Sequence, residues 1–178
     1  MRKANATFVI WSVAVAMCSG CAATNPVDTQ KVLELEQHVK ISAAQQSALL
    51  AAIAAHATEG LFVIPNIPEK MKLTVRKRYI LPADEEILAI IDATILGSAA
   101  NGLVIGQTGV YVRNDWTGSS PGRHFLPYSK YCTLGIEQWG FYEVYLGGLG
   151  FDMNTCTMSK GAVVSLLRDV RETLRETR

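Results

Sequence analysis

The stretch from Glu86 to Asn114 constrains the fold more than any other part of the sequence. Its first half is an apolar run, rich in β-branched residues, between Pro82 and Gly97. A run of this length and composition favours a buried strand over a helix. Its second half, residues 102–112, contains two short β-rich runs joined by a Gly-Gln-Thr-Gly connection. This spacing predicts a hairpin in which the glycines supply positive φ angles.

More short strands are predicted after the hairpin, without helices between them. The first, His124 to Tyr128, is expected at a sheet edge because it contains Pro127. The others cover residues 133–139, 141–146 and 151–158. Such a succession predicts an antiparallel sheet that curls on itself.

The C-terminal segment has the pattern of an amphipathic helix. Ser159 is its predicted N-cap, and basic residues lie around its apolar stripe. The stripe consists of Val163, Leu166, Leu167, Val170 and Leu174. We expect this helix to plug the open end of the half-barrel.

These elements resemble a known fold family. Glu-Glu-Ile-Leu from Glu85, Asp-Ala-Thr-Ile-Leu-Gly-Ser-Ala from Asp92, and Thr-Gly-Val-Tyr from Thr108 are similar to bacterial pleckstrin-homology-like (PH-like) domains. The resemblance covers residues 69–178. It implies an α+β fold, with a bent antiparallel β-sheet or partial barrel capped by the C-terminal helix. It also implies that Asp92 and Thr94 order a strand end and corner rather than perform chemistry.

The N-terminus has the pattern of a secretory signal. Arg2 and Lys3 precede an apolar span, residues 8–17, that is too short to cross a bilayer comfortably. The following Cys-Ser-Gly-Cys resembles a bacterial lipoprotein signal, in which the cysteine after the cleavage site is acylated. The resemblance implies that Cys21 is that residue, although Cys18 stands where the family usually has leucine. Ala22 after it suits an outer-membrane lipoprotein that faces the periplasm.

Composition supports one globular domain with an N-terminal extension. The 178 residues are 49% hydrophobic and 19% charged, with a net charge of +1. Removing Arg2 and Lys3 with the signal leaves 15 basic against 16 acidic residues. No bulk charge therefore indicates a nucleic acid partner.

The predicted domain organisation has four parts. Residues 1–20 are the signal peptide, 21–60 a lipid-anchored helical stalk, 61–68 a linker and 69–178 the PH-like domain. The stalk helix is expected to run from a cap at Asp28-Thr29 to about His56, with His38 and His56 in solvent. Because its heptads are incomplete, the stalk helix has two interpretations: a spacer between the membrane and the domain, or a weak coiled coil that forms a homo-oligomer.

A short helix is predicted from Glu69 to Arg78, with Pro68 at its first turn. One face is basic and is formed by Lys70, Lys72, Arg76, Lys77 and Arg78. Such a face either contacts anionic lipid or an acidic partner, or it is simply solvated. The solvated alternative is the commoner one for an amphipathic helix.

The two remaining cysteines, Cys132 and Cys156, have two interpretations. In an oxidising envelope compartment a pair of cysteines is a disulfide candidate. The alternative is two buried thiols that behave as small hydrophobic residues. The sequence alone does not separate these alternatives.

One motif points weakly to catalysis. Gly118 to Gly122 matches G-x-S-x-G, so that Ser120, His124 and an acid, Asp115 or Asp152, form a candidate hydrolase triad. However, the motif leads into a strand rather than a helix, and this context argues against it. No phosphate-binding loop or metal-ligand spacing is present in the sequence, so we expect no cofactor.

Aromatic residues form the last candidate site. We expect Trp116 to be exposed, and Phe141 and Tyr145 to share the core face of a strand. The leading hypothesis is a non-enzymatic, lipid-anchored envelope protein that presents its domain to a protein or peptide, for example by strand addition at an open sheet edge. A serine hydrolase that uses Ser120 and His124, and anionic-lipid binding by the Lys70–Arg78 face, are the alternatives.

Overall fold

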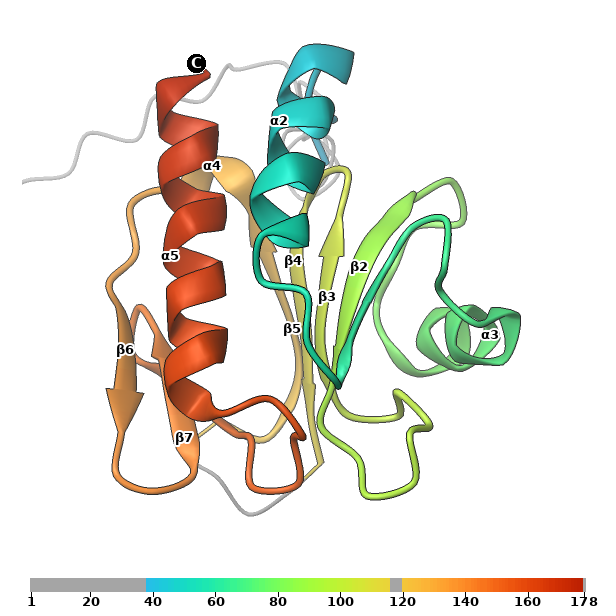
Figure 1. Ribbon diagram of the computed structural model, residues 1–178, viewed down its shortest axis with the longest axis vertical. Coiled ribbons are helices and arrows are strands. Elements are labelled where there is room, and N and C mark those ends of the chain that lie inside the picture. Colours follow the sequence, from blue (N-terminus) through green and yellow to red (C-terminus); the bar gives the residue numbers. More distant parts are fainter. Residues whose placement is uncertain (1–37, 116–119, 178) are drawn as a thin grey trace, which may run out of the picture.

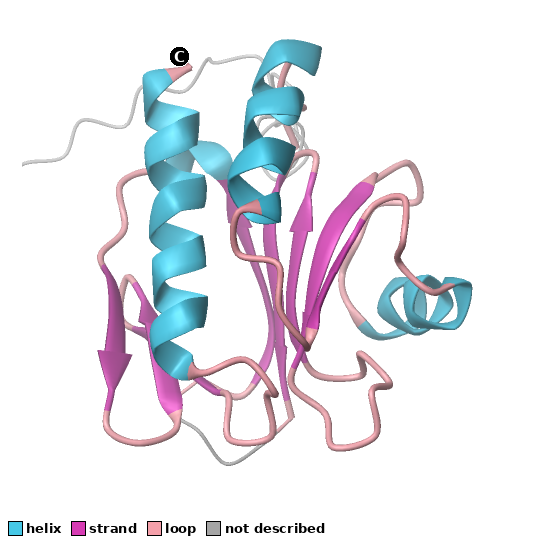
Figure 2. Ribbon diagram, viewed as in Figure 1, coloured by secondary structure: helices cyan, strands magenta, loops and turns pink. Residues whose placement is uncertain are grey.

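The computed structural model describes residues 38–115 and 120–177, which form an α+β domain with two antiparallel sheets (Figures 1 and 2). The larger sheet has five strands in the order β1-β2-β3-β4-β5, and the smaller has three in the order β6-β7-β8. Neither sheet closes into a barrel. The strands are β1 (Leu61–Val63), β2 (Ile87–Asp92), β3 (Gly102–Gly106), β4 (Gly109–Asn114), β5 (Gly122–Pro127), β6 (Ile136–Trp139), β7 (Glu143–Leu146) and β8 (Leu149–Asp152). The helices are α2 (Ala43–Ala54), α3 (Glu69–Arg78), α4 (Tyr128–Tyr131) and α5 (Lys160–Glu176).

The five-stranded sheet is the middle layer of the domain. Helices α2 and α5 lie side by side on one face, and α3 lies on the other (Figure 1). In β2, Ile91 packs on the α5 side while Ile90 packs on the α3 side. All residues of β2, β3 and β4 are buried, because helices cover both faces of these strands. This explains why the central run is apolar without alternation.

The β3–β4 hairpin confirms the sequence prediction, but its glycines serve another purpose. Gly106 and Gly109, which flank the turn, do not have positive φ angles. A Cβ atom on Gly106 would overlap the Glu85 carboxylate, and one on Gly109 would overlap the Leu126 carbonyl oxygen. These positions are therefore glycine because neighbouring groups approach the backbone closely.

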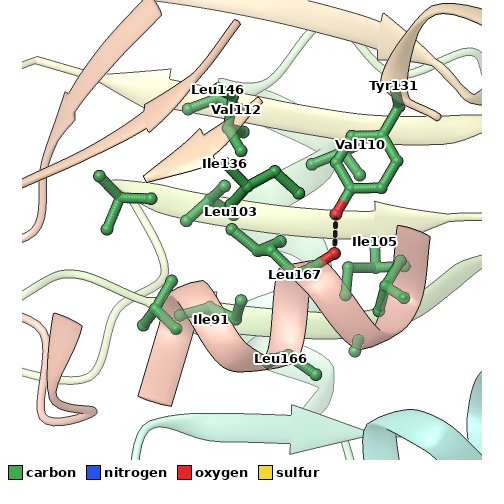
Figure 3. Close-up of a cluster of buried hydrophobic side chains, with 14 of the residues drawn as sticks. Ile91, Leu103, Ile105, Val110, Val112, Tyr131, Ile136, Leu146, Leu166 and Leu167 are labelled. Carbon is green, nitrogen blue, oxygen red and sulfur yellow. Dashed lines mark hydrogen bonds between the residues drawn. The ribbon is translucent and has the colours of Figure 1, made fainter. Parts of the chain in front are cut away.

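Helix α5 joins the two sheets into one core. Its predicted apolar stripe is entirely buried, and Ser159 caps its first turn by accepting a hydrogen bond from the Ala162 N–H. The Tyr131 hydroxyl donates to the Leu167 carbonyl at 2.6 Å (Figure 3). The helix covers one face of the two sheets, so the predicted α+β fold with a C-terminal helix over antiparallel sheets is confirmed, and neither sheet closes into a barrel.

Arginines on α5 also hold the segment that leads into β6. Arg168, Arg171 and Arg175 donate to the carbonyls of Ile136, Leu134 and Cys132, respectively. Three arginines on one side of α5 thus bind carbonyl groups of the turn after α4 and of the start of β6. The basic residues around the stripe are therefore structural and are not a free charged surface.

The predicted stalk and linker differ from the structure. Residues 38–42 are not helical, and Ser42 and Gln45 form a capping box that starts α2 anew. Leu49 and Ile53 are fully buried against the core, so they are not available as a coiled-coil seam. Residues 61–63, expected in a linker, form edge strand β1. The described domain therefore begins before residue 69.

The histidines of the predicted stalk also have partners in the domain. His56 Nε2 lies 2.7 Å from Asp169 Oδ2 on α5. The ring of His38 stacks on that of Phe125 in β5, with 4.5 Å between the ring centroids. Neither histidine is simply solvated, because residues 38–56 fold against the domain.

We expect Ile53→Val to lower the free energy of unfolding by about 1 kcal/mol, because it removes a buried methylene from the α2–α5 contact. Denaturant titration monitored by circular dichroism measures this loss. The same change at the 46% exposed Ile80 is the control, with an expected effect below about 0.5 kcal/mol. Equal effects at both positions would show that α2 is not packed on the domain.

Candidate interaction site

The β6–β7 ribbon is the candidate interaction site. Ile136, Val144 and Leu146 are buried in the core. Their neighbours Glu137 and Tyr145 are directly paired across the two strands, as are Trp139 and Glu143. Because side chains alternate along a strand, these four residues share the face that points away from the core.

Three large aromatic side chains around the ribbon turn are exposed to solvent. The exposed fractions are 62% for Trp139, 86% for Phe141 and 54% for Tyr142. The expectation that Phe141 lies with Tyr145 on the core face is wrong. The turn starts at Gly140, which has a φ angle of +55°, so Phe141 lies outside the strand alternation. Tyr145 is half-buried and faces outward.

The outward face of the ribbon carries a shallow groove of about 390 Å³. The rings of Trp139 and Tyr145 form one side, with 5.8 Å between their centroids and an interplanar angle of 51°. The lining residues are Gly135, Glu137, Trp139, Tyr145, Gly147 and Gly148. Gly135 and Gly148 have no side chain to fill the groove, and the only formal charge among its lining residues is the Glu137 carboxylate.

The loop between β2 and β3 adds aliphatic side chains at the same end of the molecule as the ribbon turn (Figure 1). Ile95 is 77% and Leu96 is 90% exposed. Asp92 orders this loop by accepting hydrogen bonds from the Thr94 N–H and hydroxyl at 2.9 and 2.7 Å. Asp92 and Thr94 thus order the end of β2 and the start of the loop that follows it.

Hydrogen bonds connect the loops at this end to one another. The Met153 N–H donates to the Tyr142 carbonyl at 2.7 Å, and the Thr155 hydroxyl donates to the Ala93 carbonyl at 2.6 Å. We call this region, residues 93–101, 140–142 and 153–159, the loop end. The start of α2 lies at the opposite end, where Gln45 contacts Thr177 at the end of α5.

The predicted basic face of α3 is divided by the structure. Arg76 donates to the carbonyls of Ala83 and Glu85 at 3.2 and 2.8 Å, so it holds the chain after the helix. Lys72 lies 3.4 Å from Glu69 in an ion pair. Lys70, Lys77 and Arg78 are exposed. Three of the five predicted residues thus remain as a basic surface.

The candidate triad is not assembled among the described residues. The Ser120 hydroxyl accepts a hydrogen bond from the Gly150 N–H, and His124 Nε2 lies 3.2 Å from the Ser120 carbonyl oxygen rather than from the hydroxyl. Asp115 forms an ion pair with Arg113. Asp152 accepts from the Asn154 N–H. Ser120 and His124 therefore stabilise the approach of β8 to β5.

Cys132 and Cys156 are buried thiols that are not joined in a disulfide. Cys156 lies just before the first turn of α5, whereas the Cys132 carbonyl accepts from Arg175 in its last turn. A helix of 17 residues is about 25 Å long. This separation is far beyond the Cα distance of about 7 Å that a disulfide tolerates, so the disulfide alternative is wrong for this fold.

We expect both thiols to resist alkylation until the protein unfolds. Burial raises the pKa of the Cys156 thiol to about 11, so very little thiolate is present at pH 8. Peptide mapping after iodoacetamide treatment, with and without denaturant, measures this, and Cys156→Ser assigns the labelled site. Prompt labelling of the native protein, or a Cys132–Cys156 peptide under non-reducing conditions, would contradict the structure.

Two predicted site residues, Cys21 and Trp116, lie outside the described residues. Within residues 38–115 and 120–177, no helix combines the length and apolar character needed to cross a membrane. The same ranges contain no group of three or more His, Cys, Asp or Glu side chains placed to hold a metal ion. Searches of protein-family models, curated proteins and solved structures found no match to this chain.

Proposed function

We propose that this chain is a lipid-anchored envelope protein without enzymatic activity, and that its domain binds another protein through the β6–β7 ribbon and the loop end. The exposure of Trp139, Phe141 and Tyr142 on one ribbon carries the proposal. Exposed aromatic side chains that cluster on a surface are typical of the central contacts of protein interfaces. Ile95 and Leu96 extend the apolar surface from the neighbouring loop.

The anchor in this proposal is Cys21, acylated in the outer membrane and facing the periplasm. The described chain enters the domain at the end opposite the loop end (Figure 1). The first described residues therefore do not cover the loop end, which remains accessible to a protein partner.

A PH-like architecture is part of the proposal. After β1, the strands follow one another as a four-stranded meander, β2 to β5, and a three-stranded meander, β6 to β8. A single C-terminal helix, α5, then packs on both. This order of elements supports the resemblance seen in the sequence.

The anchor is tested by mass spectrometry of the mature N-terminus. We expect a chain that begins at Cys21 and carries acyl chains, because two or more chains are needed for stable membrane attachment. Cys21→Ser should yield an unacylated protein that does not partition with membranes. A mature wild-type chain that begins elsewhere without acylation would contradict this part of the proposal.

The interface is tested with a triple variant, Trp139→Ser, Phe141→Ser and Tyr142→Ser. In detergent-solubilised envelopes we expect the wild-type protein to migrate in a complex larger than the monomer, and the triple variant to migrate as the monomer. Leu73→Ser is the control, since Leu73 is 62% exposed on α3. A triple variant that stays in the complex would contradict the proposed interface.

Anionic-lipid binding is a second candidate, favoured by the exposure of Lys70, Lys77 and Arg78. Glutamine at these three positions should then abolish salt-sensitive flotation with phosphatidylglycerol vesicles. Lys72→Gln is the matched control, because Lys72 is paired with Glu69. Flotation that the triple substitution leaves unchanged would exclude this face.

A further inference from the structure

We propose that the groove on the β6–β7 ribbon binds a cationic side chain, an arginine or lysine, carried by the protein partner. This inference rests on the proposed function and names the chemistry of the partner's contact. It starts from the cross-strand pairs Glu137–Tyr145 and Trp139–Glu143. Paired side chains on one sheet face lie about 5 Å apart. Each aromatic ring of the groove therefore has a carboxylate-bearing residue as its direct neighbour.

The groove has the components that recognise a cation. The faces of aromatic rings attract cations, and tryptophan does so most strongly. The rings of Trp139 and Tyr145 are tilted by 51°, so they form an open angle rather than a closed stack. The Glu137 carboxylate lines the same groove and would supply the opposite charge. A guanidinium group can stack on a ring and bind a carboxylate at once.

No residue that lines the groove has a basic side chain that could itself bind the Trp139 ring and the Glu137 carboxylate. At the ribbon turn, the chain already contains a contact between a cation and an aromatic ring. Lys160 Nζ lies 5.6 Å from the centroid of the Tyr142 ring, so a cation sits over an aromatic face at the ribbon turn. The groove offers the tryptophan ring and a carboxylate, together with space beside Gly135 and Gly148, where no side chain projects. Charge complementarity therefore favours a basic segment over an apolar or acidic one.

The probe for this site is a fluorescent hexa-arginine peptide, titrated against the mature full-length protein in a neutral detergent and followed by anisotropy. We expect saturable binding that weakens with salt. Trp139→Ala should lower the affinity about 5- to 30-fold, and Trp139→Phe should restore part of it. Glu137→Gln should lower it about 2- to 5-fold. A hexa-citrulline peptide, which has the same shape without the charge, should not bind measurably.

Two variants are matched controls. Leu73→Ala removes an exposed apolar side chain on α3, and Glu176→Gln removes an exposed charge at the end of α5. Both should keep the wild-type affinity within about 2-fold, because neither side chain lines the groove.

Several results would overturn the proposal. The first two are equal hexa-arginine binding by all variants and no hexa-arginine binding by the wild-type protein. The other two would assign the groove another occupant: an N-acetylglucosamine oligomer that binds only when Trp139 is present, or a dimer in sedimentation that depends on Trp139. The test is separate from that of the proposed function. A large complex that Phe141 and Tyr142 sustain, without hexa-arginine binding, would leave the interface in place and remove only the cation site.

Discussion

Gly102→Ala is expected to lower the free energy of unfolding by about 3–5 kcal/mol. Gly102 begins β3 with a φ angle of +128°, where side chains are strained. A Cβ atom there would also overlap the Ile91 carbonyl oxygen of β2 and lie 3.0 Å from the Ala93 nitrogen. Neither backbone group can move without breaking the pairing of the two central strands. Thermal or denaturant unfolding measures the loss.

Gly148→Ala separates the two causes. Gly148 also has a positive φ angle, +90°, but a Cβ atom there would have no heavy atom within 4 Å. We expect Gly148→Ala to lower the free energy of unfolding by about 1–2 kcal/mol, from backbone strain alone. If both variants lost the same stability, the close approach of β2 to Gly102 would be contradicted.

Glu85→Ala is expected to lower the free energy of unfolding by about 3–5 kcal/mol, although Glu85 belongs to a loop. Glu85 is only 1% exposed. Its carboxylate accepts hydrogen bonds from the Thr108 N–H, the Thr108 hydroxyl and the Tyr111 hydroxyl, at 2.9, 2.7 and 3.0 Å. Alanine would leave these buried donors without their acceptor.

The control for Glu85 is its neighbour Glu86, which is exposed. Glu86→Ala should change the free energy of unfolding by less than about 1 kcal/mol. Glu85→Gln keeps the shape of the side chain, and we expect it to lose less than Glu85→Ala. Similar small losses for both alanine variants would show that the loop before β2 is not fixed to the β3–β4 turn by this carboxylate.

The sequence predicts the elements whose pattern is set by burial. The central strands are covered on both faces, so Ile90 and Ile91 are both apolar, and the run signals a buried strand. The five-residue stripe of α5 similarly predicts a helix with one buried face. Local patterns do not specify which surface a helix covers, so the sequence predicts a stalk helix where α2 packs on the domain.

Tertiary contacts decide the features that the sequence leaves open. Ser42 and Gln46 interrupt the heptads of the predicted stalk helix, and the structure uses Ser42 as the N-cap of α2. In the sequence, Gly106 looks like a glycine that a turn needs for a positive φ angle. In the structure, a side chain at this position is excluded by the carboxylate of Glu85, which is distant in the sequence. Arg76 belongs to a basic face in the sequence, yet it is bound by carbonyls that follow the helix.

The candidate site could be predicted only in part. The sequence shows that aromatic residues are concentrated between Trp139 and Tyr145. However, strand alternation predicts that Phe141 lies in the core, whereas it is exposed in the structure. The available signal was Gly140, which ends β6 and removes Phe141 from the alternation. The groove itself depends on the pairing of Glu137 with Tyr145, which the sequence does not specify.

Site-specific photo-crosslinking tests the proposed interface most directly. A photoreactive amino acid is placed at Phe141, and in a separate strain at Leu73 on α3, in the full chain expressed in intact cells. The proposal predicts a discrete higher-mass adduct from position 141 and none from position 73, because only the ribbon turn contacts the partner. No adduct from position 141, or the same adduct from both positions, would contradict it.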